Sequence, residues 1–262
     1  MRLHSFGITD VGLKRAHNED NFFRSDELGL YLVADGMGGH AAGEVASGAA
    51  IQAIVEFAQK HADDGGLTWP FGFDTKYNPR SNALLNGIRL ANQRLYTLQQ
   101  ERSELTGMGT TVAALRIEDG IATISHVGDS RIYRVRAGQL EQMTSDHSWV
   151  NEQLLKNIIT AEEARNHRYK NVITRALGNR LDLEIDTRAE PVQPGDHFLM
   201  CSDGLSGMVE DWEMREVVSE TCQGDLRAAS NKLVALANEA GGQDNISVVL
   251  IRCDADTEAD GV

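Results

Sequence analysis

The chain has 262 residues, of which 41% are hydrophobic, so it is long enough to bury one substantial core. Its 39 acidic residues outnumber its 25 Lys and Arg residues, and the resulting net charge of −14 disfavours binding to a nucleic-acid backbone. No run approaches the roughly 18 apolar residues of a membrane span, no apolar signal segment is present and the 3 cysteines are widely spaced, so we expect a cytoplasmic protein that binds no membrane.

The first part of the chain is organised around a buried strand that ends in an aspartate. Strands are predicted over residues 3–8, 21–24 and 28–34. The third of these stops at Asp35, which opens a glycine-rich turn. Apolar residues then recur at every fourth position from Val45 to Phe57, a spacing typical of a helix. The sequence therefore places a carboxylate between a strand end and the start of a helix.

The middle of the chain switches from helical to strand periodicity. Residues 61–80, which we call the aromatic loop, combine turn-forming residues with Trp69, Phe71 and Phe73. This composition predicts an ordered surface loop that packs its own aromatic rings. A helix is expected over residues 81–101. Four strands with very short connections follow, which favours antiparallel pairing in a meander; they cover residues 110–117, 121–127, 131–136 and 139–143.

The last part of the chain begins with a polar interruption at residues 145–180, where Thr160 and Glu163 form a predicted capping box. We expect a small lobe there. The remaining predicted elements are strands at 183–189, 197–202 and 246–252 and helices at 211–221 and 226–240. From Asp254 the chain is acidic and rich in small residues, which is typical of a flexible tail.

This order of elements predicts an α+β fold, a β-sandwich of two antiparallel sheets flanked by helix pairs. A doubly wound parallel sheet would alternate strand and helix throughout, which this chain does not do. We expect residues 1–253 to form one domain with residues 145–180 inserted, followed by the tail 254–262.

Acidic residues recur at strand ends and tight turns. They are Glu19, Asp20, Asp35, Asp129, Asp203 and Asp244. Carboxylates gathered without His or Cys partners suit hard cations such as Mg²⁺ or Mn²⁺. Gly36 adds a backbone carbonyl that a metal could approach, because glycine has no side chain in the way. Taken singly, each Asp-Gly pair is more typical of an ordinary turn than of a metal ligand, and Asn18 and Asn245 could form Asx turns beside these acids.

Two further residues suit the handling of an anion. Arg15 lies five positions before Asp20, so its guanidinium could clamp a phosphate, although spacing alone favours a surface ion pair. His40 ends the glycine-rich turn and could act as a general acid, or it could be a polar loop residue. The histidines at positions 17, 126 and 147 have no metal-ligand spacing to one another, and we interpret them as structural.

Seven motifs, in this order, resemble the metal-dependent protein serine/threonine phosphatases of type 2C in their bacterial form. They are RAHNED (15–20), VADGMGGHAAGE (33–44), GMGTT (107–111), HVGDSRIYRVRAG (126–138), TSDHS (144–148), CSDGLS (201–206) and GGQDNISVV (241–249). The resemblance covers about residues 5–252. It implies a four-layer sandwich, a centre of two Mn²⁺ or Mg²⁺ ions, and a small flap subdomain that matches residues 145–180, here called the flap segment.

The resemblance also implies roles for individual residues. Asp35 matches the carboxylate that bridges both metals, and Gly36 matches the carbonyl ligand of the second metal. Asp203 and Asp244 resemble the other ligands of the first metal. The second metal takes an acidic residue from the pair Glu19 and Asp20, between which the motif does not choose.

Three more positions follow from the same comparison. Arg15 matches the phosphate-binding arginine, and Asp129 matches a ligand of a third, weaker metal. Animal relatives carry histidine where this chain has Met37, which leaves His40 or a metal-bound water as the proton donor. Many relatives carry an acidic residue where this chain has Gly207, which bears on the third metal.

The expected function is hydrolysis of phosphoserine and phosphothreonine in proteins, by direct attack of a metal-bridging hydroxide. The implied partners are phosphorylated proteins, namely a Ser/Thr kinase and its substrates, and the protein is expected to be a monomer. One alternative is a non-catalytic phosphoprotein-binding module, which the complete set Asp35, Asp203 and Asp244 disfavours. Another is a small-molecule phosphoesterase on the same fold. Substrate choice is expected to reside in the flap segment and the aromatic loop.

Overall fold

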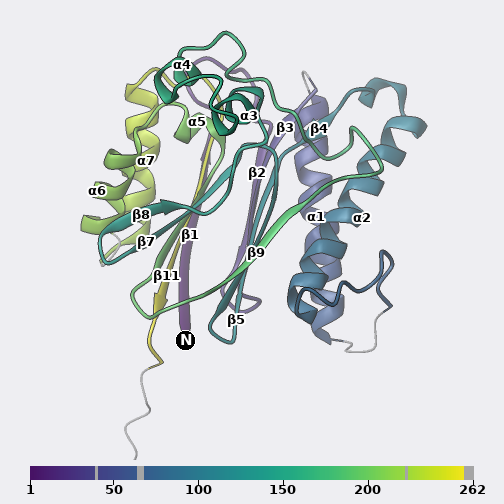
Figure 1. Cartoon of the computed structure of the whole chain (residues 1–262), viewed down its shortest axis with the longest axis horizontal. Coiled ribbons are helices and arrows are strands. Elements are labelled where there is room, and N and C mark those ends of the chain that lie inside the picture. Colours follow the sequence, from purple (N-terminus) through teal and green to yellow (C-terminus); the bar gives the residue numbers. More distant parts are fainter. Residues whose placement is uncertain (39–40, 64–67, 222–223, 257–262) are drawn as a thin grey trace, which may run out of the picture.

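Two antiparallel β-sheets pack face to face in the computed structural model, and a pair of long helices covers the outer face of each (Figure 1). The structure describes residues 1–38, 41–63, 68–221 and 224–256. The predicted fold class is confirmed. Among the helices of these ranges, none has both the length and the apolar character needed to cross a lipid bilayer.

The first sheet has five strands in the order β1-β11-β10-β7-β8. They are β1 (Arg2–Asp10), β7 (Arg131–Arg136), β8 (Gln139–Gln142), β10 (His197–Cys201) and β11 (Ile246–Asp254). Helices α6 (Asp211–Thr221) and α7 (Leu226–Glu239) pack against its outer face through a core that includes Leu199, Val217 and Leu233. The edge strand β1 pairs with β11 along its whole length.

The second sheet has the order β2-β3-β5-β6-β9, with β4 paired to the end of β3. Its strands are β2 (Asp20–Ser25), β3 (Leu30–Met37), β4 (Gly109–Thr110), β5 (Val112–Glu118), β6 (Ile121–Val127) and β9 (Asp186–Pro191). Helices α1 (Ala41–Asp63) and α2 (Pro79–Glu101) cover its outer face. A short 3-10 helix, η1 (Ser103–Leu105), follows α2.

The apolar run of β3 is explained by its burial on both faces. Side chains alternate along a strand, so Leu32 packs under α1 and α2 while Tyr31 and Val33 enter the core between the sheets. The strand also continues further than predicted. It runs through Asp35 to Met37, because Gly36 and Met37 pair with Thr110 and Gly109 of β4.

The predicted four-strand meander is wrong at one connection. Strands β5 and β6 pair with each other, and so do β7 and β8, but β6 and β7 belong to different sheets. The chain crosses from one sheet to the other at Gly128, Asp129 and Ser130. A three-residue connection can close a hairpin or step between stacked sheets, and here it does the second. Asp129 therefore lies at the edge where the two sheets meet.

The flap segment contains two short helices, α3 (Trp149–Leu155) and α4 (Ala161–Arg165), which lie above one end of the sandwich (Figure 1). The predicted capping box is confirmed, because the side chains of Thr160 and Glu163 each bond the backbone N–H of the other residue. A further short helix, α5 (Asp203–Ser206), begins directly after β10. The predicted tail begins within β11, and its residues 257–262 lie outside the described ranges.

The aromatic loop lies at the other end of the molecule. Helix α1 continues to Asp63, so the loop begins later than predicted. In its described part, residues 68–80, Trp69 and Phe73 pack edge to face with ring centroids 5.3 Å apart. Figure 1 shows this part beside the C-terminal end of α1, whereas β3 meets the N-terminal end. A helix of this length spans about 34 Å, so the loop is far from Asp35.

Candidate metal centre

Five aspartates from distant parts of the chain gather at the end of the sandwich below the flap segment. We call them the carboxylate cluster: Asp20, Asp35, Asp129, Asp203 and Asp244. Asp20 and Asp35 stand directly opposite each other on β2 and β3. Asp203 follows β10, Asp244 precedes β11 and Asp129 lies in the crossing between the sheets. Desolvation, and after it the charges of the other four aspartates, raises the pKa of Asp35.

Burial is the main reason why four of these acids have raised pKa values; they are Asp20, Asp35, Asp129 and Asp203. Desolvation, followed by the charges of neighbouring acids, raises the pKa of Asp129 to about 8 and that of Asp203 to about 6. Desolvation also raises the pKa of Asp20 to about 7, although hydrogen bonds from Ser202 and Ser247 oppose it. The pKa of Asp35 is raised well above its ordinary value, again chiefly by desolvation. Like charges this close are unfavourable unless a cation or protons offset them.

The oxygen atoms of the cluster fit a hard divalent cation. One oxygen each of Asp20, Asp129 and Asp203 is buried without a hydrogen-bond donor. Buried acceptors are nearly always paired, so such atoms indicate a missing positive partner. All the atoms that the cluster offers to a metal are oxygens, which are the ligands that Mg²⁺ and Mn²⁺ prefer.

Glu19 and Asp20, between which the motif did not choose, occupy different places. Asp20 is 5% exposed and accepts a 2.6 Å hydrogen bond from Ser202 inside the cluster. The side chain of Glu19 lies against the first turn of α1, where desolvation raises its pKa and the N–H of Gly43 and the charge of Arg15 lower it. One oxygen of Glu19 is also buried without a donor.

Asp35 is held through its backbone by Thr110 of β4 and by Thr111, which lies between β4 and β5. Its N–H donates to the Thr111 hydroxyl at 3.0 Å, and its carbonyl accepts from the Thr110 hydroxyl at 2.8 Å and from the Thr111 N–H at 2.9 Å. Asp203 also forms a side-chain hydrogen bond with Asp35, which lowers the pKa of Asp203 against the larger effect of burial. The two threonines of the motif GMGTT were not singled out from the sequence, although their place in that motif was a signal.

Arg15 reaches the cluster directly. Its Nη2 donates to Asp244 Oδ2 at 2.6 Å, and the side chain remains 50% exposed. Sequence spacing favoured a surface ion pair, and Arg15 does form an exposed one; its partner is a member of the carboxylate cluster.

Asn245 holds the loop that carries Arg15, a role that the sequence did not reveal. Its Oδ1 accepts from the N–H of Glu19 at 2.8 Å, and its Nδ2 donates to the carbonyls of Val11 and His17 at 3.0 and 2.9 Å. The neighbouring Gly242 carbonyl also accepts from the N–H of Leu13 at 2.8 Å. Residues 11–19 therefore depend on the turn before β11 for their position.

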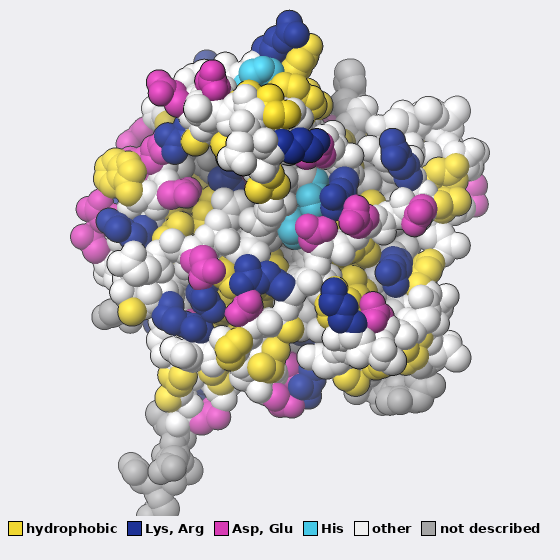
Figure 2. Space-filling view, in the orientation of Figure 1, with side chains coloured by type: hydrophobic (Ala, Val, Ile, Leu, Met, Phe, Trp, Pro, Cys, Tyr) yellow, Lys and Arg dark blue, Asp and Glu magenta, His cyan; other side chains and the backbone are white. Residues whose placement is uncertain are grey.

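A cleft of about 640 Å³ opens from the cluster between the flap segment and the residues after β10. Asp129, Asp203 and Asp244 line it, together with Arg165 and Lys170 of the flap segment. No described residue of the aromatic loop contributes to this lining, so the structure gives no support to the expected part of the loop in substrate choice. Figure 2 shows Lys and Arg side chains interspersed with Asp and Glu over this face.

Three other predicted positions have different outcomes. His40 lies outside the described residues. Met37 ends β3 and pairs with Gly109, so its backbone belongs to the sheet. Gly207 lines the cleft, and its N–H donates to the carbonyl of Asp203 at 2.7 Å. The relatives' acidic side chain has no counterpart at this position.

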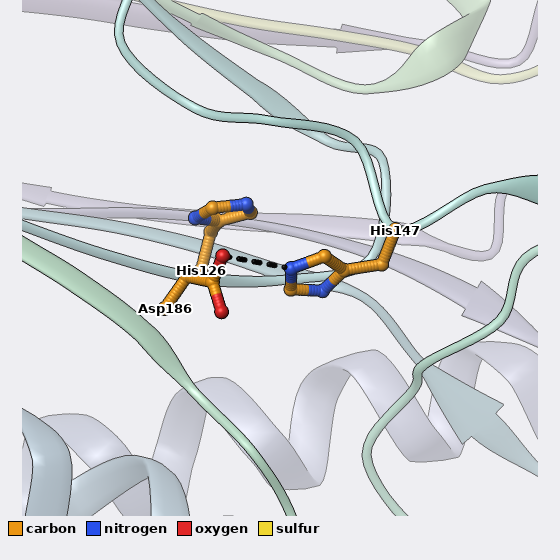
Figure 3. Close-up of side chains that lie close together, drawn as sticks. All are labelled: His126, His147 and Asp186. Carbon is orange, nitrogen blue, oxygen red and sulfur yellow. Dashed lines mark ion pairs between the residues drawn. The ribbon is translucent and has the colours of Figure 1, made fainter. Parts of the chain in front are cut away.

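A second polar cluster lies beside the crossing between the sheets. The side chains of His126, His147 and Asp186 converge there, as Figure 3 shows. Their sequence separation gave no sign of this proximity, because it arises from the pairing of β6 with β9 and from the return of the flap segment.

The comparisons with known proteins agree with this geometry. A family model for protein phosphatase 2C matches residues 14–240. Protein phosphatase PhpP of Streptococcus pneumoniae is 36% identical over 247 residues, which is 93% of this chain and 95% of that protein. Serine/threonine phosphatase stp of Listeria monocytogenes is 36% identical over 255 residues, 96% of each chain.

Two solved structures of PstP agree in fold. The Mycobacterium tuberculosis serine/threonine phosphatase PstP/Ppp superposes with a TM-score of 0.85 at 33% identity and covers 97% of this chain and 100% of its own. The catalytic domain of PstP in complex with 2 manganese ions gives a TM-score of 0.82 at 32% identity, covering 97% of this chain and 99% of its own.

Proposed function

We propose that this chain, which belongs to the protein phosphatase 2C family, is a metal-dependent phosphatase that hydrolyses phosphoserine and phosphothreonine in proteins. The observation that carries this proposal is the carboxylate cluster. Three of its aspartates each have a buried oxygen without a hydrogen-bond donor, and three of its aspartates line a cleft. Mn²⁺ or Mg²⁺ is the expected cofactor, with two ions at the core and a weaker third.

The metal ligands in this proposal are Asp35, Asp203 and Asp244, with the carbonyl of Gly36. Asp20, whose side chain lies inside the cluster, is the acidic ligand favoured for the second metal. The side chain of Glu19 lies beside it, against the first turn of α1. Asp129 holds the weaker third ion. When bound, these cations lower the pKa of water and offset the charge of the phosphoryl oxygens.

Arg15 binds the phosphoryl group in this proposal. It already donates through Nη2 to Asp244, and its half-exposed guanidinium has further N–H groups in a fixed fork. A guanidinium placed beside the carboxylate cluster can orient a phosphate and share its charge. His40, proposed from the sequence alone, supplies a proton to the leaving serine or threonine oxygen.

The cleft favours a protein substrate over the two alternatives. Its volume of about 640 Å³ and its lining by several separate segments suit a phosphorylated side chain with its flanking residues. A non-catalytic binding module would not need the full set of clustered carboxylates, which are costly to keep together.

Residues 1–253 form one catalytic domain in this proposal, with the flap segment inserted at the entrance of the cleft. A Ser/Thr kinase and its substrates are the proposed phosphoproteins, and the protein acts as a monomer. We place it in the cytoplasm, where thiols stay reduced, in agreement with the free buried thiols of Cys201 and Cys253.

The test measures phosphate release from a phosphothreonine peptide with Mn²⁺, with and without a chelator. We expect Asp35→Asn to lower kcat about a hundredfold or more, because it removes the central carboxylate. Asp119→Asn changes an exposed carboxylate in the β5–β6 turn and should leave kcat unchanged. Activity that survives both the chelator and Asp35→Asn would overturn the proposal. Faster turnover of a small aryl phosphate than of the peptide would favour the phosphoesterase alternative.

A further inference from the structure

The turn that carries Asp129 is held by one residue of the flap segment. The N–H of Gly128 donates to His147 Nδ1 at 3.1 Å, and the N–H of His147 donates to the carbonyl of Gly128 at 2.9 Å. Gly128 has a φ of +103°, and a Cβ there would overlap Thr111. The turn is therefore built around a glycine, and His147 bonds both polar groups of that glycine.

These contacts select one form of the His147 ring. Nδ1 accepts a hydrogen bond from the Gly128 N–H, which places the proton of the neutral imidazole on Nε2. Arg175 Nη1 lies 3.2 Å from Nε2, and in this form of the ring it donates to Asp186 at the shorter distance of 2.9 Å instead. Nε2 faces Asp186 Oδ2 at 3.3 Å (Figure 3). Asp186 in turn accepts from Arg175 Nη1 through Oδ1 at 2.9 Å. Burial lowers the pKa of His147, which agrees with a neutral ring.

The first residues of the flap segment form hydrogen bonds with residues before and after Asp129 in the chain. Arg131 donates to Asp146 through Nε at 2.9 Å and through Nη2 at 2.7 Å. The ring of His126 stacks on His147, and its Nε2 bonds the carbonyl of Ser145 at 2.9 Å. Asp129 thus lies between two residues, at positions 128 and 131, that are each bonded to the first residues of the flap segment.

A metal at His126, His147 and Asp186 would be a different explanation for their proximity, and the geometry disfavours it. The two rings are stacked, with centroids 4.6 Å apart and planes 22° apart, so their in-plane lone pairs do not converge. Arg175 Nη1 also lies 3.2 Å from His147 Nε2, where it would repel a cation. A hydrogen-bonded network explains the same contacts.

We propose that His147 is a positioning residue, which aims the Asp129 carboxylate into the centre by bonding the Gly128 peptide groups and so couples Asp129 to the flap segment. This inference rests on the proposed function for the role of Asp129. When a group that orients a metal ligand through hydrogen bonds is removed, metal affinity or activity commonly falls by about 10–100-fold.

Two variants separate positioning from mere packing. His147→Asn keeps an amide oxygen near the place of Nδ1 and can still accept from Gly128. His147→Gln keeps a donor near the place of Nε2 and loses that acceptor, although its volume is closer to that of histidine. We expect Mn²⁺ affinity, measured by calorimetry on metal-free protein, to fall about 10–100-fold for His147→Gln and only a few-fold for His147→Asn. Equal losses in both variants, or greater loss in His147→Asn, would show packing alone.

Nitrogen NMR of the wild-type protein tests the same inference if His147→Gln does not fold. We expect an Nε2-protonated ring with a scalar coupling between Nδ1 and the Gly128 amide; a proton on Nδ1 would overturn the inference. Coordination of added Zn²⁺ by His147 would overturn it as well. The wild-type protein and the two variants could show the predicted order of Mn²⁺ affinities while the wild-type protein releases no phosphate. In that case the proposed function fails and the positioning role of His147 stands.

Discussion

At the scale of single residues, Gly36 shows why this position excludes a side chain. A Cβ at residue 36 would lie 2.6 Å from the carbonyl oxygen of Glu19 and closer still to that of Gly43. Its own N–H donates to the Glu19 carbonyl at 3.2 Å. Close backbone packing therefore already requires glycine at position 36. The proposed approach of a metal to the Gly36 carbonyl is a second reason for the same residue.

Gly36→Ala should therefore destabilise the protein even without metal. We expect the free energy of unfolding to fall by about 1–3 kcal/mol, because rigid backbone atoms must shift to admit the methyl group. Urea denaturation of metal-free protein measures this loss.

The matched control is Gly48→Ala in α1, where a Cβ would lie 3.7 Å from the Asn21 amide. It should raise the same free energy by roughly 0.5–1 kcal/mol, since alanine is the better helix former. A Gly36→Ala protein as stable as wild type would contradict the packing argument.

At the scale of elements, the loops at the centre are positioned by side-chain amides rather than by strands. Asn245 holds residues 11–19 through three hydrogen bonds. Asn92 of α2 holds the end of the flap segment in the same manner, with bonds to Gly178, Arg180 and Leu181. Both asparagines are buried, but only Asn245 supports the loop of Arg15.

Asn245→Ala and Asn92→Ala should lower the free energy of unfolding by a similar amount, about 2–3 kcal/mol, because each substitution leaves several polar groups without their hydrogen-bond partner. Only Asn245→Ala should also raise KM for a phosphothreonine peptide, by roughly tenfold, since it frees the Arg15 loop. Steady-state kinetics under conditions where both variants are folded decide this. Equal KM values in the two variants would show that the Arg15 loop does not depend on Asn245.

The flap segment lines the cleft, whereas the part of the aromatic loop that the structure describes does not. Arg165 pairs with Glu210 at 3.3 Å across the cleft, whereas the Lys170 ammonium has no ion pair with a described residue. Lys170 is therefore available to acidic residues that flank the phosphorylated one.

Lys170→Glu should reduce the preference for phosphopeptides with acidic flanks over those with basic flanks by roughly twofold to fivefold, the range of an exposed charge contact. Phe73→Ser in the aromatic loop is the control and should leave the ratio of kcat/KM values unchanged. A change in that ratio for Phe73→Ser alone would restore the original expectation for the loop.

At the scale of the whole molecule, the centre costs stability when no cation is bound. The pKa values of Asp20 and Asp129 rise from the ordinary 3.8 to about 7 and about 8 on folding. An acid with a raised pKa binds its proton more tightly in the folded state, so its stabilising effect is present at low pH and is lost as the pH rises toward the folded value.

The metal-free protein should therefore melt about 5 °C or more lower at pH 8 than at pH 6. Saturating Mn²⁺ should remove most of this difference, because it binds the ionised carboxylates and competes with protons. Calorimetric scans measure both. Asp129→Asn should flatten the pH dependence of the metal-free protein; an unchanged slope in that variant would exclude Asp129 as a source.

Much of the fold could be predicted because periodicity and turn chemistry are local. The run before Asp35 is apolar throughout since β3 is covered on both faces, and the boundaries of β6, β7 and α6 match their predictions. The candidate site could be named from motifs in a fixed order. The prediction of a four-strand meander was wrong because a three-residue connection does not determine whether the next strand pairs with the previous one or crosses to another sheet.

The sequence by itself determined the fold class, the family and the acids that form the carboxylate cluster, because these depend on residue types and their spacing. Only the tertiary structure decided what those acids meet. It placed Asp20 inside the cluster and Glu19 at α1, paired Arg15 with Asp244, and set His147 against Gly128. Each of these contacts joins segments far apart in the chain, where burial and charge act through space and leave no local pattern.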